Sequence, residues 1–122
     1  MAARAVTIGI DVVQISRFEQ ALQRRPRLAE RCFSPAEHAY CSRQRRPAQH
    51  YAARFAAKEA VAKALQAPVR WREIEVAREG GPPRIILSGA TLERAAGRTV
   101  SVSLSHDGDV AVAAAIAQVV EP

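Results

Sequence analysis

The chain has 122 residues, a length typical of one domain with a modest hydrophobic core, and we expect a single domain over residues 1–122. Apolar residues make up 48% of it and charged residues 25%, a composition that excludes a chain disordered throughout. Lys and Arg outnumber Asp and Glu by 18 to 12, so the formal net charge is +6 and an anionic partner is expected: nucleic acid, a phosphorylated ligand or an acidic protein.

Residues 6–13 are rich in β-branched side chains and predict a first strand. The apolar run is far too short for a signal sequence or a membrane span, so we expect a cytoplasmic protein without a membrane partner. Asp11 interrupts this strand. A carboxylate among apolar residues needs an ion pair, hydrogen bonds or a metal ion, unless it lies at the strand end and faces water.

Two capping patterns predict short helices in the first half of the chain. Ser16 and Glu19 have the spacing of a capping box and predict a helix to about residue 25. Ser34 and Glu37, with Pro between them, predict a second helix to about residue 43.

The longest predicted helix covers about residues 48–66 and ends before Pro68. Its centre is largely apolar but carries four charged residues. Glu59 and Lys63 fall on one face, while Arg54 and Lys58 form a pair on another. Two surface ion pairs would explain this pattern; the alternative is a buried helix whose charges have a function.

The second half of the chain predicts mainly strands. Residues 71–78 and 84–87 flank Gly80-Gly81-Pro82 and predict a hairpin. Residues 89–97 predict a short helix with Leu92 and Ala95 facing inward. Residues 99–105 and 110–120 predict two further strands, the last of them central because it is almost entirely apolar. Strands at both ends and helices in the first half indicate an α+β domain.

Two other kinds of site are not favoured. Cys32, Cys41, His38 and His50 lack the spacing of a standard zinc site, and we interpret the cysteines as reduced thiols. Residues 103–107 place serines beside His106 and Asp107, but these serines lie in a strand and not at a nucleophile elbow, so a serine hydrolase is not favoured.

Four motifs then occur in a characteristic order. They are Gly9-Ile10-Asp11-Val12-Val13 followed by Arg17; Phe33-Ser34 with Glu37 and Tyr40-Cys41; Arg54-Phe55-Ala56-Ala57-Lys58-Glu59-Ala60 with Lys63-Ala64; and Ser103-Leu104-Ser105-His106. Together they resemble the holo-acyl-carrier-protein synthase family, the short, single-repeat class of 4'-phosphopantetheinyl transferase, over about residues 9–117. The resemblance implies a small, mostly antiparallel sheet packed with a long central helix and shorter helices. It also implies homotrimers with active sites between subunits.

The activity implied by the resemblance is magnesium-dependent transfer of 4'-phosphopantetheine from coenzyme A to a serine hydroxyl of apo acyl carrier protein, with release of adenosine 3',5'-bisphosphate. Asp11 and Glu59 match the family's magnesium ligands, at which manganese is an alternative. Lys63 matches a catalytic lysine that reaches the phosphates, and His106 a histidine at the pyrophosphate. The candidates for binding the 3'-phosphate are Arg43, Arg45, Arg46 and Arg54. Arg17 matches an arginine that contacts the carrier, supported by Arg24 and Arg25.

Several alternatives stay open at this point. The base that accepts the serine proton is a metal-bound water, Glu59 or Asp107, and the carrier belongs to fatty-acid or polyketide synthesis. Gln66-Ala67-Pro68 replaces the glycine-rich turn common in the family, which affects the loop near the nucleotide.

The rival function is a non-enzymatic basic module for nucleic acid or an acidic protein. It leaves Asp11, Glu59 and His106 unexplained, and six aromatic residues provide no stacking array for nucleic acid, so nucleic acid is not expected as a partner.

Overall fold

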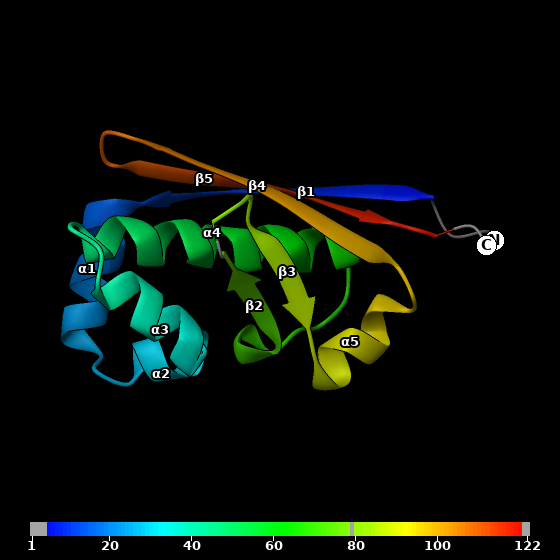
Figure 1. The fold of residues 1–122 in the computed structure, drawn as a ribbon, viewed down its shortest axis with the longest axis horizontal. Helices are drawn as coiled ribbons and strands as arrows, with labels where there is room; N and C mark the ends of the chain where they lie inside the picture. Colours follow the sequence, from blue (N-terminus) through cyan, green and yellow to red (C-terminus); the bar gives the residue numbers. More distant parts are fainter. Residues whose placement is uncertain (1–4, 79, 121–122) are drawn as a thin grey trace.

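The structure is a computed structural model that describes residues 5–78 and 80–120. Its main sheet is antiparallel, with strand order β1 (Val6–Gln14), β5 (Val110–Gln118) and β4 (Thr99–Asp107). The long helix α4 (Pro47–Leu65) lies along one face of this sheet, and the remaining elements lie on the same side (Figure 1). These are α1 (Ile15–Arg24), α2 (Leu28–Cys32), α3 (Pro35–Ser42), the 3₁₀ helix η1 (Trp71–Glu73), the hairpin strands β2 (Ile74–Ala77) and β3 (Arg84–Leu87), and α5 (Gly89–Ala95).

Small residues allow α4 to approach the sheet closely. The alternate residues of β5 that face the helix are Ala111, Ala113, Ala115 and Ala117, all buried. A β-carbon on Gly9 of β1 would lie 1.9 Å from the carbonyl oxygen of Ala60 in α4, so only glycine fits there. The predicted central place of the last strand is confirmed, because β5 pairs with both β1 and β4.

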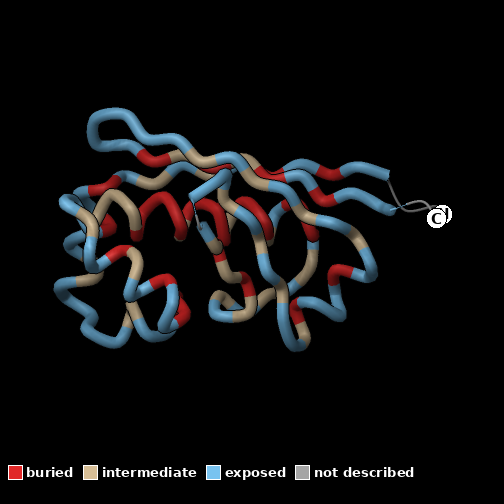
Figure 2. Tube along the Cα trace, in the orientation of Figure 1, coloured by how far each residue is buried: buried red, intermediate tan, exposed pale blue. Residues whose placement is uncertain are grey.

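The core has two clusters that meet along α4. One lies between α4, the sheet and the β2–β3 hairpin and includes Val61, Leu65 and Ile74. The other packs the aromatic rings of Phe18, Phe33 and Tyr51 among α1, α3 and the first turns of α4. Figure 2 shows that α4 is largely buried, which agrees with the many alanines in its sequence.

Two details of the sequence-based prediction are wrong. Ser16 does not cap α1; the N-cap residue is Gln14, and Ser16 instead donates its backbone N–H and hydroxyl to Asp109. Leu92 is 52% exposed, and Thr91 is the buried residue of the first turn of α5 because its hydroxyl donates to Glu73. The second capping box, at Ser34 and Glu37, is confirmed, and the short helix α2 was not predicted.

Candidate active site

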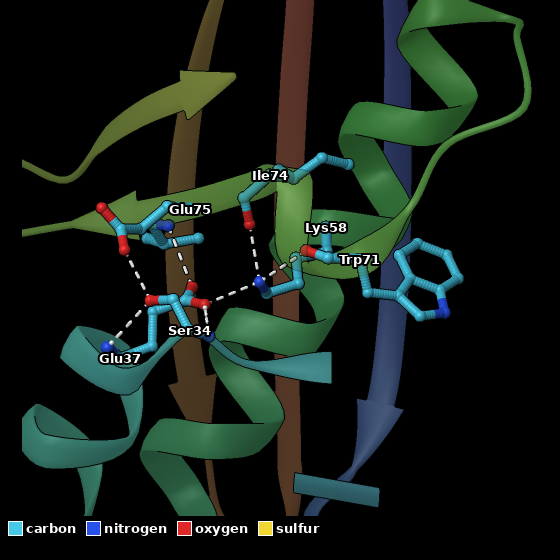
Figure 3. Close-up of polar contacts among 7 residues, drawn as sticks. Ser34, Glu37, Lys58, Trp71, Ile74 and Glu75 are labelled. Carbon is cyan, nitrogen blue, oxygen red and sulfur yellow. Dashed lines mark hydrogen bonds and ion pairs between the residues drawn. The ribbon is translucent and has the colours of Figure 1, made fainter. Parts of the chain in front are cut away.

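The four charged residues of α4 have three different environments, so the interpretation as two surface pairs is wrong. Lys58 is completely buried, and its Nζ donates to Glu37 Oε1 at 2.7 Å and to the carbonyl oxygens of Trp71 and Ile74 (Figure 3). The second Glu37 oxygen accepts from the backbone N–H of Val76 at 2.9 Å. This buried pair therefore joins α3, α4, η1 and β2, and fixes which way α4 is turned about its axis.

Asp11, Glu59 and Lys63 lie together where β1 passes α4. Lys63 Nζ donates to Asp11 Oδ1 at 3.2 Å and to the Ile10 carbonyl oxygen at 2.9 Å. Burial raises the pKa of Glu59, the charge of Asp11 raises it further, and Lys63 opposes both effects. The structure thus brings together two carboxylates and one ammonium, from residues distant in the sequence.

His106 lies at the other end of α4. Its Nε2 is 3.0 Å from Nε2 of Gln49, in the first turn of that helix. Gln49 also lines a pocket of about 400 Å³ with Arg45, Arg46 and His50. The structure therefore places Arg45 and Arg46 near His106. It also adds Gln49 to the candidate site, a residue that no sequence motif indicated.

Arg54 is 3% exposed, and its guanidinium lies 4.1 Å from the centre of the Tyr40 ring. Among the described residues its Nε has no hydrogen-bond partner. It lines a pocket of about 360 Å³ with Arg43, Arg78 and Arg84. A buried arginine with an unused donor, among three other arginines, suits an anionic ligand.

His50 connects these two basic regions. Burial lowers its pKa, and the charges of Arg54 and His106 lower it further. His50 and Arg54 are also one turn apart on α4. His106, Arg45, Arg46 and Arg54 therefore belong to one side of α4.

The remaining predicted site residues are exposed. Arg17, Arg24 and Arg25 are presented by α1 and its C-cap. Asp107 ends β4, where strand alternation assigns it to the face opposite His106. Cys32 and Cys41 are both buried free thiols, and no cluster of three or more metal-binding side chains exists in residues 5–78 and 80–120. No helix within the described ranges has the length and apolar character to cross a membrane.

Comparisons with known proteins agree with this architecture. A family model of the 4'-phosphopantetheinyl transferase superfamily matches residues 7–115. The holo-[acyl-carrier-protein] synthase of Streptomyces griseus is 49% identical over 119 residues, which cover 93% of this chain and 98% of that protein.

Solved structures show the same fold. The ACPS–CoA complex of Chronobacterium ammoniagenes superposes with a TM-score of 0.85 at 30% identity, covering 97% of this chain and all of that one. The Helicobacter pylori holo-[acyl-carrier-protein] synthase, in complex with coenzyme A, has a TM-score of 0.81 at 32% identity, covering 91% of this chain and 99% of that one. The chain therefore belongs to the 4'-phosphopantetheinyl transferase superfamily, in its holo-[acyl-carrier-protein] synthase family.

Proposed function

We propose that this protein transfers 4'-phosphopantetheine from coenzyme A to a serine hydroxyl of an apo acyl carrier protein and releases adenosine 3',5'-bisphosphate. The observation that carries the proposal is the cluster of Asp11, Glu59 and Lys63, within a chain whose relatives are synthases of this kind and bind coenzyme A. A non-enzymatic basic module is not favoured, because it provides no use for this cluster.

Asp11 and Glu59 fit a divalent cation. The charge of Asp11 raises the pKa of Glu59, so the carboxylates repel one another and a bound cation would relieve this repulsion. Magnesium accepts one or two carboxylates and fills its other positions with water and substrate phosphates, so a cluster of only two protein ligands suits it, and manganese is the alternative. When bound, the metal would neutralise charge on the diphosphate during attack at phosphorus.

Lys63 is the proposed phosphate-binding residue at the reacting end. Its Nζ is held by Asp11 and the Ile10 carbonyl oxygen, while the side chain as a whole is 54% exposed, so a substrate phosphate can reach it. Glu59 is the better supported of the two side chains proposed as base. Burial makes its carboxylate more basic than usual, whereas Asp107 is directed away from the helix side of the sheet.

The nucleotide end is proposed to bind on the other side of α4. Arg54 and Arg43, with Arg78 and Arg84, line a pocket in which the 3'-phosphate would meet several guanidinium groups. Glu37 and Glu75 also line it, and each of these carboxylates already accepts a hydrogen bond within the chain. His106, held by Gln49, is the proposed contact to the pyrophosphate, with Arg45 and Arg46 beside it.

We infer that one chain does not complete the site, because these two ends are far apart along α4. Gln49, which holds His106, lies ten residues before Glu59 on α4, a separation of about 15 Å along the helix axis. We therefore propose that a second copy supplies the nucleotide side next to Asp11, Glu59 and Lys63, in the homotrimer that the resemblance implies.

The outer face of the sheet is the surface proposed for this contact. Ile8, Ile10 and Val12 of β1 are 70%, 59% and 62% exposed, and the helices all cover the opposite face (Figures 1 and 2). An apolar surface of this kind is typical of contacts between protein chains. Asp11 faces α4, on the side of β1 opposite Ile10 and Val12, but β1 is an edge strand. A copy that extends around this edge would therefore lie beside the proposed metal site.

Arg17, Arg24 and Arg25 are proposed to bind the acidic carrier, since all three are exposed along α1 and its C-cap. The cytoplasmic location stays a prediction, supported by two buried thiols that are not joined in a disulfide.

Mass spectrometry tests the proposed function directly. The protein is incubated with an apo carrier, coenzyme A and magnesium, and the carrier should gain the mass of one phosphopantetheine group. Asp11→Ala and Glu59→Ala should abolish this gain and leave the circular-dichroism spectrum unchanged, because each removes a proposed metal ligand. No gain on any of several apo carriers would contradict the activity, and near-normal turnover in both variants would contradict the site.

A further inference from the structure

Helix α1 begins without a cap of its own. Its N-cap residue Gln14 makes no side-chain cap hydrogen bond, and its first turn contains no acidic residue. Such a helix start leaves backbone N–H groups without partners. The partner comes instead from the turn between β4 and β5: Asp109 accepts from the backbone N–H of Ser16 at 2.8 Å and also from the Ser16 hydroxyl.

A third contact strengthens this connection. The carbonyl oxygen of Asp109 accepts from the backbone N–H of Ile15 at 2.8 Å. The hydrogen bonds from Ser16 lower the pKa of the Asp109 carboxyl, so it is ionised at neutral pH and complements the positive end of the helix dipole. We call Asp109, Ile15 and Ser16 the turn–helix clasp.

The clasp connects two parts of the proposed site that are distant in the sequence. Arg17 follows Ser16 in the first turn of α1, and His106 precedes Asp109 by three residues on the same hairpin. The cleft beside the clasp, of about 390 Å³, is also lined by Arg45, Arg46 and Gln49. The first turn of α1 is therefore fixed relative to the proposed pyrophosphate region by one residue, Asp109, through its carboxylate and its backbone carbonyl oxygen.

We propose that Asp109 is a positioning residue for carrier binding: it caps α1 from the β4–β5 turn and so holds Arg17 in place to meet the carrier. This inference rests on the proposed function, because it takes Arg17 to contact the carrier. Without the clasp the first turn of α1 frays, and re-forming it makes the free energy of carrier binding less favourable.

The test compares Asp109→Ala with Asp109→Asn in steady-state transfer. Asp109→Ala should raise the KM for carrier by up to about fivefold, the change expected from the loss of one helix cap, and should leave the KM for coenzyme A and kcat within about twofold. Asp109→Asn should restore most of the carrier affinity, because its amide oxygen still accepts from Ser16. Glu93→Gln, at an exposed carboxylate on α5, is the matched control and should change neither KM.

Hydrogen exchange of the free chain provides a readout independent of activity. The amide of Ser16 should exchange faster in Asp109→Ala than in the wild type. Faster exchange with a raised KM for carrier alone supports the proposal. Unchanged exchange, an unchanged KM for carrier, or an equal rise in both KM values overturns it while the proposed function stands. Absence of transfer by the wild type would instead overturn the proposed function, and this inference with it.

Discussion

Replacing Lys58 by Met removes one half of the buried ion pair while keeping most of the side-chain volume. Lys58 and Glu37 are both 0% exposed in their side chains, and all three Lys58 donors are used. The methionine leaves a buried carboxylate that still accepts from the backbone of Ser34 and Val76 but has no counter-ion. Two backbone carbonyl oxygens also lose their donor.

The loss should be large compared with the total stability of a domain of this size. Removing one partner of a buried pair costs about 3–5 kcal/mol, whereas whole domains are stable by about 5–15 kcal/mol. An unfolding entropy of about 2.1 cal/mol/K per residue gives roughly 0.26 kcal/mol/K for this chain, so Tm should fall by about 12–20 °C. Burial lowers the pKa of Lys58 although Glu37 raises it, which shows that burying the ammonium is itself costly. The double variant Lys58→Met with Glu37→Gln should therefore lose much less than the sum of the single variants.

Thermal and urea unfolding, followed by circular dichroism, measure this difference. Lys63→Met is the matched control, because it makes the same substitution on the same helix at a side chain that is 54% exposed, and it should cost less than about 1 kcal/mol. A loss for Lys58→Met no greater than that for Lys63→Met would refute the reasoning. Additive losses in the double variant would show that the two groups do not act as a pair.

Three further predictions concern the site. Gly9→Ala should lower both the stability, measured by unfolding, and the transfer activity, measured from the carrier mass. The new β-carbon would lie 1.9 Å from the Ala60 carbonyl oxygen, so β1 must move from α4 by about 1.5 Å to reach ordinary contact near 3.4 Å. Unchanged activity would contradict this. Metal-free Glu59 has a raised pKa, so the folded state keeps its proton above pH 4.5 and loses it as the pH rises. Magnesium affinity, measured from the shift in Tm, should therefore increase with pH through this window, and Asp11→Asn should reduce the increase; a flat profile would argue against Glu59 as a ligand. Arg17→Ala should raise the KM for carrier and not for coenzyme A, and the reverse result would assign Arg17 to the nucleotide.

Local patterns predicted most of the elements, and the errors come from contacts between distant residues. The capping box at Ser34 succeeds because both of its hydrogen bonds join residues three apart. The same spacing at Ser16 fails because Asp109, 93 positions away, takes both donors of that serine. Sequence spacing alone does not distinguish these two cases.

In the candidate site, too, local patterns were predictable and contacts between distant residues were not. Asp11 stood out from the residues alone because a carboxylate in an apolar strand requires a partner, whereas its pairing with Glu59 came from the family resemblance. The burial of Lys58 was not predictable, because its partner Glu37 lies on another helix and its carbonyl acceptors lie beyond Pro68. The assignment of Leu92 to the core was wrong for a similar reason. Glu73, which lies outside α5, accepts hydrogen bonds from Thr91 and so determines which face of α5 is buried.

The geometry of α4 is the reason for proposing that two copies build one site. Arg54 and Lys63 are nine residues apart, which at about 100° per residue places them on opposite faces and about 13 Å apart along the axis. The buried Lys58 prevents α4 from turning, so one helix cannot direct both residues to one ligand. If the proposed roles of both residues hold, coenzyme A that contacts Arg54 of one copy meets Lys63 of another. Mixing inactive Arg54→Ala chains with inactive Lys63→Ala chains, under conditions that exchange subunits, should restore transfer at sites that combine the two intact residues. Mixtures that form and stay inactive would show that each chain builds its site alone.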